Sequence, residues 1–235
     1  MVSTACNPQA GAGSTPSTAL QGRTIVTVKE LAVAPIPWQV AKVIFERKHY
    51  LHSQPGGTLF NFGVFSGGLK GAVCFARGAT KAYRLVEGAS TRDCATLARL
   101  WLSDELPRNR ESRVIGVVLQ ALRRHSSLKF LISYADPAQG HLGTIYQATG
   151  WLCTGLSEAM PLYDLGDGIP RHSQSLSHAF GTHSVAHFQA SGVTVRKVPQ
   201  AAKHRYVYFL VGSWRPRLRV PVLPYPKKEA CVETC

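Results

Sequence analysis

Two side chains that can move protons flank one predicted connection between a strand and a helix. Asp136 follows Leu128–Ser133, a short apolar run typical of a strand covered on both faces. It would lie at the carboxyl end of that strand, where α/β sheets bind ligands, and a carboxylate there can take a proton from an amine. Tyr146 lies in the predicted helix Thr144–Thr149, and a phenol with an ordinary pKa of about 10 keeps its proton at neutral pH. The alternatives are an Asp136 that only caps the turn before Pro137 and a Tyr146 that only fills the core.

His49 and Tyr50 come at the end of the first predicted helix, which has Trp38, Ala41 and Phe45 on one face. A Gly-Gly turn follows soon afterwards, so this helix end is expected to cross the mouth of the site. An aromatic ring in that position could stack on a base extruded from DNA. The simpler interpretation is an imidazole that complements the dipole at the helix C-terminus.

Arg99 lies in the predicted strand Thr96–Leu102. An unpaired guanidinium is costly to bury, so we expect Arg99 to meet a carboxylate or a phosphate. A structural ion pair and a contact with an anionic ligand both satisfy this expectation.

The apolar pattern predicts one α/β domain over residues 24–165 that positions these side chains. Residues 1–23 are small and polar and are expected to be disordered. A strand, a helix and a hairpin with a turn at Ser66-Gly67-Gly68 precede Ile115–Leu122, whose apolar spacing predicts a long helix. Strand, helix and strand follow, which is the pattern of a mixed twisted sheet flanked by helices.

Residues 166–235 are expected to form a basic extension that packs on the domain and contacts DNA. Among 235 residues, 27 Lys and Arg against 13 Asp and Glu give a formal net charge of +14, which points to a nucleic-acid partner. No Asp or Glu occurs between residues 168 and 228, so this stretch should bind phosphates with a salt-dependent affinity. The alternative is a basic tail that is only solvated. The predicted DNA contacts are Lys203, Arg205, Arg215, Arg217 and Arg219.

The loop over residues 172–187 is rich in histidine, and its second half is expected to include a helix from Ser184 to Gln189. Polar contacts to DNA or plain surface positions are the main expectation, because a metal site would need further ligands that converge in space. The four histidines are His172, His178, His183 and His187.

Composition excludes several classes of protein. Hydrophobic residues make up 45% and charged residues 17%, which is a globular composition. No apolar run reaches the roughly 20 residues of a membrane-spanning helix, and the N-terminus lacks the pattern of an export signal. The six cysteines form no Cys-x-x-Cys pair, so a reducing cytoplasm is the expected location. The sequence is compatible with a homodimer.

Several segments together resemble known proteins over about residues 45–155. They are His49-Tyr50, Phe62-Gly63-Val64, Leu97–Leu100 with Arg99, Pro107–Arg113, Ser133–Asp136 and Gly143–Tyr146. Their order resembles the acetyltransferase fold of the GNAT type and, more narrowly, the Mom family of phage DNA-modification proteins.

This resemblance implies conversion of the exocyclic amino group of adenine in DNA to a methylcarbamoyl form, which protects phage DNA from restriction in the host cytoplasm. It implies catalytic roles for His49, Tyr50, Asp136 and Tyr146, with Tyr146 as the general acid. It also implies an iron ion held by the first three of these. The residues implied to hold the donor are Arg99, Arg108, Asn109, Ser112 and Ser133.

The segment Pro107–Ser112 occupies the place of the GNAT pyrophosphate loop but has no glycine. Acyl-CoA and an activated amino acid therefore both stay open as donors. The acceptor chemistry is demanding, because an adenine inside a duplex must first be flipped out at a cost of a few kcal/mol. Two other functions remain: an ordinary GNAT acyltransferase acting on a protein, RNA or small-molecule amine, and a noncatalytic nucleic-acid-binding protein that keeps the fold.

Overall fold

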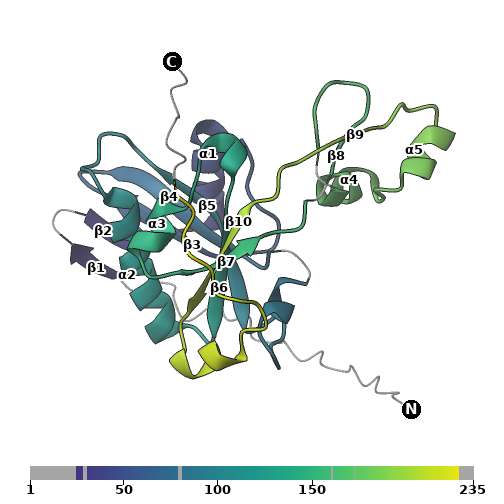
Figure 1. The fold of residues 1–235 in the computed structure, drawn as a ribbon. Coiled ribbons are helices and arrows are strands. Elements are labelled where there is room, and N and C mark those ends of the chain that lie inside the picture. Colours follow the sequence, from purple (N-terminus) through teal and green to yellow (C-terminus); the bar gives the residue numbers. More distant parts are fainter. Residues whose placement is uncertain (1–24, 29–30, 79–80, 160, 172, 228–235) are drawn as a thin grey trace, which may run out of the picture.

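The computed structural model describes residues 25–28, 31–78, 81–159, 161–171 and 173–227, and one eight-stranded sheet organises most of them (Figure 1). The strand order is β1-β2-β3-β4-β5-β6-β10-β7. Neighbouring strands are antiparallel except β5 and β6, which are parallel. The strands are β1 (Ile25–Val28), β2 (Leu31–Pro35), β3 (Thr58–Phe65), β4 (Leu69–Ala76), β5 (Cys94–Leu102), β6 (Phe130–Ala135), β7 (Leu152–Leu156) and β10 (His204–Phe209).

Helices cover both faces of this sheet, which confirms the predicted mixed sheet flanked by helices. Alternate residues of β4 divide between the faces: Val73 packs in the cluster with α2 (Arg110–His125) and α3 (Thr144–Ala148), whereas Cys74 packs against α1 (Trp38–Lys48). The 3-10 turns η2 (Ala82–Leu85) and η4 (Gly212–Arg217) share one cluster with Cys94, Ile132 and Val207. Within the described ranges, no helix has the length and apolarity to cross a bilayer.

The local patterns in the sequence predict the central elements well. The long helix is confirmed as α2, and the hairpin is confirmed as β3 and β4, with a left-handed φ of +61° at Gly67 in its turn. On the predicted face of α1, Ala41 and Phe45 are fully buried, whereas Trp38, the first residue of the helix, is 50% exposed.

The C-terminal part differs from the expected extension, because one of its strands lies inside the sheet. β10 pairs with β6 on one side and with β7 on the other, and its residues Tyr206 and Val207 are fully buried. The segment between β7 and β10, residues 157–203, projects from the sheet, and we call it the arm (Figure 1). It contains β8 (Leu162–Asp164), α4 (Ser173–Phe180), α5 (Val185–Ala190) and β9 (Arg196–Val198).

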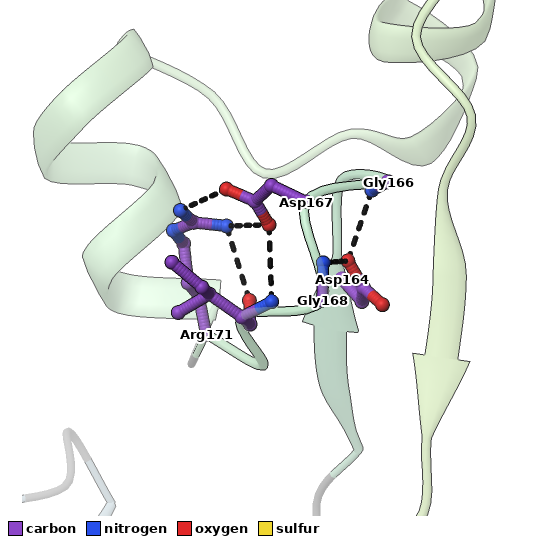
Figure 2. A network of polar contacts seen from close by, with 6 residues as sticks. Asp164, Gly166, Asp167, Gly168 and Arg171 are labelled. Carbon is purple, nitrogen blue, oxygen red and sulfur yellow. Dashed lines mark hydrogen bonds and ion pairs between the residues drawn. The ribbon is translucent and has the colours of Figure 1, made fainter.

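Local bonds hold the turn that leads from β8 into α4 (Figure 2). The buried Asp164 carboxylate accepts hydrogen bonds from the amides of Gly166 and Gly168, at 2.9 and 3.0 Å. Asp167 forms an ion pair with Arg171. Both carboxylates of the turn are therefore engaged within the arm.

The direction of β10 places η4 far from the carboxyl end of β6. His204 pairs with Ala135 at that end, whereas Phe209 pairs with Phe130 at the amino end. The amides of Leu210 and Val211 then donate to the carbonyl of Lys129. The two ends of β6 are separated by about 17 Å at the rise of an extended chain, so η4 lies at the opposite end of the sheet from Asp136.

Gly143 immediately precedes α3, and only glycine fits at this position. Its φ is +74°, and a Cβ there would lie 2.4 Å from Cε2 of Tyr206. Gly150, with φ +76°, would present its Cβ to open space. We expect Gly143→Ala to lower the free energy of unfolding by about 3 kcal/mol, because left-handed strain and overpacking add, and Gly150→Ala to lower it by only about 1 kcal/mol. Denaturant unfolding measures both, and equal losses would contradict this packing.

Candidate active site

The candidate active site lies where β5 and β6 separate. The two strands pair only through Cys94–Thr96 and Phe130–Ile132. Just beyond, Ser133 Oγ lies 3.1 Å from the Leu97 carbonyl oxygen and 2.8 Å from the Tyr146 hydroxyl. A carbonyl only accepts, so the one hydroxyl hydrogen of Ser133 goes to Leu97 and the phenol donates to Ser133. Ser133 therefore connects the strands to Tyr146.

Tyr146 is buried on α3 beside two other aromatic rings. Its ring centroid lies 5.2 Å from that of Trp151 and 5.0 Å from that of Tyr206. Burial raises the pKa of Tyr146 to about 12, and the nearby phenol of Tyr50 acts in the same direction, whereas the contact with Ser133 opposes it. The phenol therefore keeps its proton at neutral pH, as a general acid requires.

His49 ends α1 as a buried, neutral imidazole. It is 6% exposed, its Nδ1 accepts from the amide of Leu51 at 3.1 Å, and its ring stacks on Tyr50 at 4.4 Å. Burial lowers the pKa of His49 to about 4, and the positive charge of Arg99 contributes. The imidazole thus supports the ring of Tyr50 rather than carrying a charge.

Tyr50 presents an aromatic ring to solvent at the mouth of the site. Its side chain is 48% exposed, and its ring lies 6.1 Å from that of His141 in an edge contact. Partial burial raises the pKa of Tyr50, the charge of Asp136 adds to this effect, and Arg99 opposes it. Tyr50 therefore lies within the electrostatic reach of both groups.

Arg99 has no carboxylate partner within the described residues, so it forms no structural ion pair there. Its guanidinium donates to the carbonyl and hydroxyl of Ser53, at 3.1 and 3.2 Å, and to the carbonyl of Ala98 at 2.8 Å. Burial lowers the pKa of Arg99 from its very high ordinary value. These neutral oxygens accept hydrogen bonds from the guanidinium but do not compensate its positive charge. An anionic ligand can therefore pair with Arg99.

Asp136 both caps a turn and forms an ion pair. Its carboxylate accepts from the amide of Ala138 at 3.0 Å, at the start of η3 (Pro137–Gln139), and lies 3.0 Å from Nζ of Lys203. A carboxylate offers about four lone-pair positions, so these two contacts leave room for a further donor. Lys203, expected to bind DNA, instead lies beside the site.

The N-terminus of α2 presents the residues expected to hold a donor. Arg108 and Asn109 are exposed, and Asn109 has a left-handed φ of +61°. Ser112 Oγ donates to the carbonyl of Asn109 at 3.1 Å, so its hydroxyl is turned back to the backbone. The amides of the first helical turn and the charge of Arg108 can still receive an anion.

The residues proposed for iron do not fit a metal site. Nδ1 of His49 accepts from a backbone amide, and the carboxylate of Asp136 is already ion-paired with the ammonium group of Lys203. Across the described residues, no three side chains of His, Cys, Asp or Glu converge in a metal-binding arrangement.

The expected DNA contacts do not form one surface. Arg205 donates to the hydroxyl and carbonyl of Thr154, at 3.0 and 2.9 Å. Arg217 stacks on Trp214, and Arg219 lies 3.4 Å from Glu87. Arg215, Arg217 and Arg219 are exposed and lie within η4 or just after it. They are therefore at the opposite end of the sheet from the site.

The histidine-rich loop is partly helical. The predicted helix is confirmed as α5, capped by Ser184, but α4 was not predicted. His183 Nδ1 bonds with Ser177 Oγ at 2.8 Å, and His183 precedes α5, so it does not share a helix face with His187. His172 lies outside the described residues. The side chain of His178 does too.

Sequence reasoning missed two residues that complete the site. His141 lies against Tyr50, and its amide donates to the carbonyl of Asp136. Ser53 provides the two acceptors of the Arg99 side chain that lie outside β5, namely its carbonyl and its hydroxyl. Neither lies in a spacing that predicts a contact, because each is brought in by a loop.

Comparison with known proteins places this chain in a family. The model of the Mom protein family matches residues 30–227, and the chain belongs to the Mom protein family. It is similar to methylcarbamoylase Mom of Escherichia phage Mu, with 32% identity over 212 residues, which is 85% of this chain and 85% of that protein.

Solved acetyltransferase structures are more distant. The ribosomal-protein-S5-alanine acetyltransferase of Vibrio fischeri is 10% identical, with a TM-score of 0.48 over 82% of this chain and 98% of that one. A GNAT family acetyltransferase of Elizabethkingia anophelis, solved with acetyl-CoA bound, is 8% identical, with a TM-score of 0.43 over 77% of this chain and 99% of that one.

The neutral His49 predicts a pH dependence of stability. A histidine in the unfolded chain has a pKa of about 6.5, and the folded value is about 4. Between these values the unfolded state binds more protons, so stability should fall as pH falls from about 6.5 towards 4, by up to about 3 kcal/mol from this group. Denaturant unfolding of His49→Gln should show a shallower loss over this window.

The same substitution at the exposed His187 is the control and should leave the pH dependence unchanged. If His49→Gln and the unaltered protein lose stability in parallel between pH 6.5 and 4, His49 is not the group that this packing holds neutral.

Proposed function

We propose that this protein converts the exocyclic amino group of adenine in DNA to a methylcarbamoyl form and so protects phage DNA from restriction. The observation that carries the proposal is that Tyr146 bonds to Ser133 where β5 and β6 separate, while His141 contacts both the exposed ring of Tyr50 and the backbone of Asp136. Membership of the Mom family and the name of the phage Mu relative support the reaction. The host cytoplasm is the proposed place of action.

The acceptor base would be held at the end of α1. An adenine flipped from the duplex can stack on the exposed ring of Tyr50, which the ring of His49 supports from behind. Its amino group is then offered to the remaining lone pairs of Asp136. The carboxylate takes a proton from this amine as the new bond to carbon forms.

The donor would lie between Arg99 and the N-terminus of α2. An anionic part of an acyl-CoA or of an activated amino acid can pair with the uncompensated charge of Arg99 and with Arg108. The hydroxyl of Tyr146 can turn from Ser133 to the leaving atom and give it a proton, while Ser133 keeps its bond to Leu97. The phenol is restored when it regains a proton from solvent.

Mass spectrometry of nucleosides from cells that express the protein tests the reaction and the substrate together. We expect one new deoxyadenosine adduct with the mass of a methylcarbamoyl group, absent from cells that express Asp136→Asn. Unmodified DNA, with acyl groups found instead on protein, RNA or small amines, would replace this function by that of an ordinary acyltransferase.

The proposed proton transfers predict large effects of small substitutions. Asp136→Asn keeps the volume but removes the base, and Tyr146→Phe removes one hydroxyl, so each should reduce modification by about 100-fold or more. Tyr208→Phe removes a hydroxyl that meets Arg123 away from the site and is the matched control. Modification within a few-fold of the unaltered protein would assign Asp136 or Tyr146 to structure alone.

A further inference from the structure

The position of the site limits where DNA can lie. A flipped base stays bonded to its own backbone, so the phosphates on either side of it must lie next to the pocket that receives it. In the proposed function, that place is the carboxyl end of β6, beside Asp136 and Tyr50, which His141 contacts together. The arginines of η4 follow the other end of β10 and cannot contact these flanking phosphates.

Several cations of the site, of the N-terminus of α2 and of the arm already have carboxylate partners. The paired cations are Arg110 with Asp104, Lys203 with Asp136, Arg196 with Asp164, and Arg171 with Asp167. The remaining positive charge at this end is therefore carried by a few exposed side chains for which the described residues provide no carboxylate.

Two of these side chains are consecutive in the last turn of α1. Arg47 and Lys48 are exposed and immediately precede His49 and Tyr50. Tyr50 and the next residue, Leu51, are 48% and 41% exposed. A pair of cations and an exposed aromatic ring thus lie within four consecutive residues at one helix end, which is the combination that binds a phosphate backbone and an unstacked base.

A third exposed cation lies in the arm. Lys197 is exposed in β9, and the chain leads from it over six residues to Lys203, which pairs with Asp136. The arm enters and leaves the sheet at this point, because Ser157 donates its amide to the carbonyl of Lys203. The base of the arm therefore borders the pocket.

We infer that duplex DNA docks on the end of α1 and on β9 of the arm, with Arg47, Lys48 and Lys197 bound to phosphates that flank the flipped adenine. This inference rests on the proposed function, since it assumes that DNA is the substrate. It moves the main DNA contact from η4 to the site end of the sheet.

Salt-dependent binding of a fluorescent duplex tests this surface. The double variant Arg47→Gln/Lys48→Gln should bind more weakly and should show a plot of log affinity against log salt that is shallower by about two, one for each lost phosphate contact. Lys197→Gln, on a separate element, should lower the slope by about one. Arg215→Gln/Arg217→Gln removes the same charge from η4 and should keep the original slope.

The outcomes separate the two proposals. If the slope of log affinity against log salt becomes shallower in Arg215→Gln/Arg217→Gln but not in the α1 and β9 variants, the docking surface is wrong. DNA would then still be the substrate. No binding of duplex by the unaltered protein at low salt would contradict the proposed function itself. Thermal unfolding of each variant shows whether it is folded, and Lys197→Gln tests the surface even if the α1 variant is not.

Discussion

β5 and β6 run parallel for only three residue pairs, and the geometry of the site depends on their separation. Backbone groups beyond Thr96 and Ile132 cannot pair across the gap, so the hydroxyl of Ser133 satisfies the carbonyl of Leu97. The same hydroxyl accepts a hydrogen bond from the phenol of Tyr146, which lies in α3. The close approach of Gly143 to Tyr206 then holds α3 against β10. One break in the ladder thus separates the two strands and positions the hydroxyl of Tyr146 beside the gap.

Charge is distributed so that the opening is positive. His49 is held neutral by burial, and Asp136 is balanced by Lys203, so Arg99 remains with only neutral oxygens around it. An uncompensated, partly buried guanidinium is costly in the free protein. An anionic donor would relieve that cost on binding, which links the electrostatics around Arg99 to the proposed substrate.

Local patterns in the sequence predict α2, the β3–β4 hairpin and the neighbourhood of Asp136 and Tyr146, because each depends on spacing within a few residues. They do not predict that β10 lies between β6 and β7, since the register of Tyr206 against Ser133 is set by contacts between distant segments. The sequence does not predict the partners of Arg99 and Asp136 for the same reason. Ser53 and Lys203 lie in loops, which have no periodic pattern.

The central claim is that one fork holds the acceptor base, the base catalyst and the acid together. The most direct measurement is a structure of the protein bound to a duplex that contains its target adenine. The account predicts a flipped adenine stacked on Tyr50, with its amino nitrogen within about 3 Å of the carboxylate of Asp136 and on the same side of the sheet opening as the hydroxyl of Tyr146. An adenine that remains stacked in the duplex, or one bound away from β5 and β6, would contradict it.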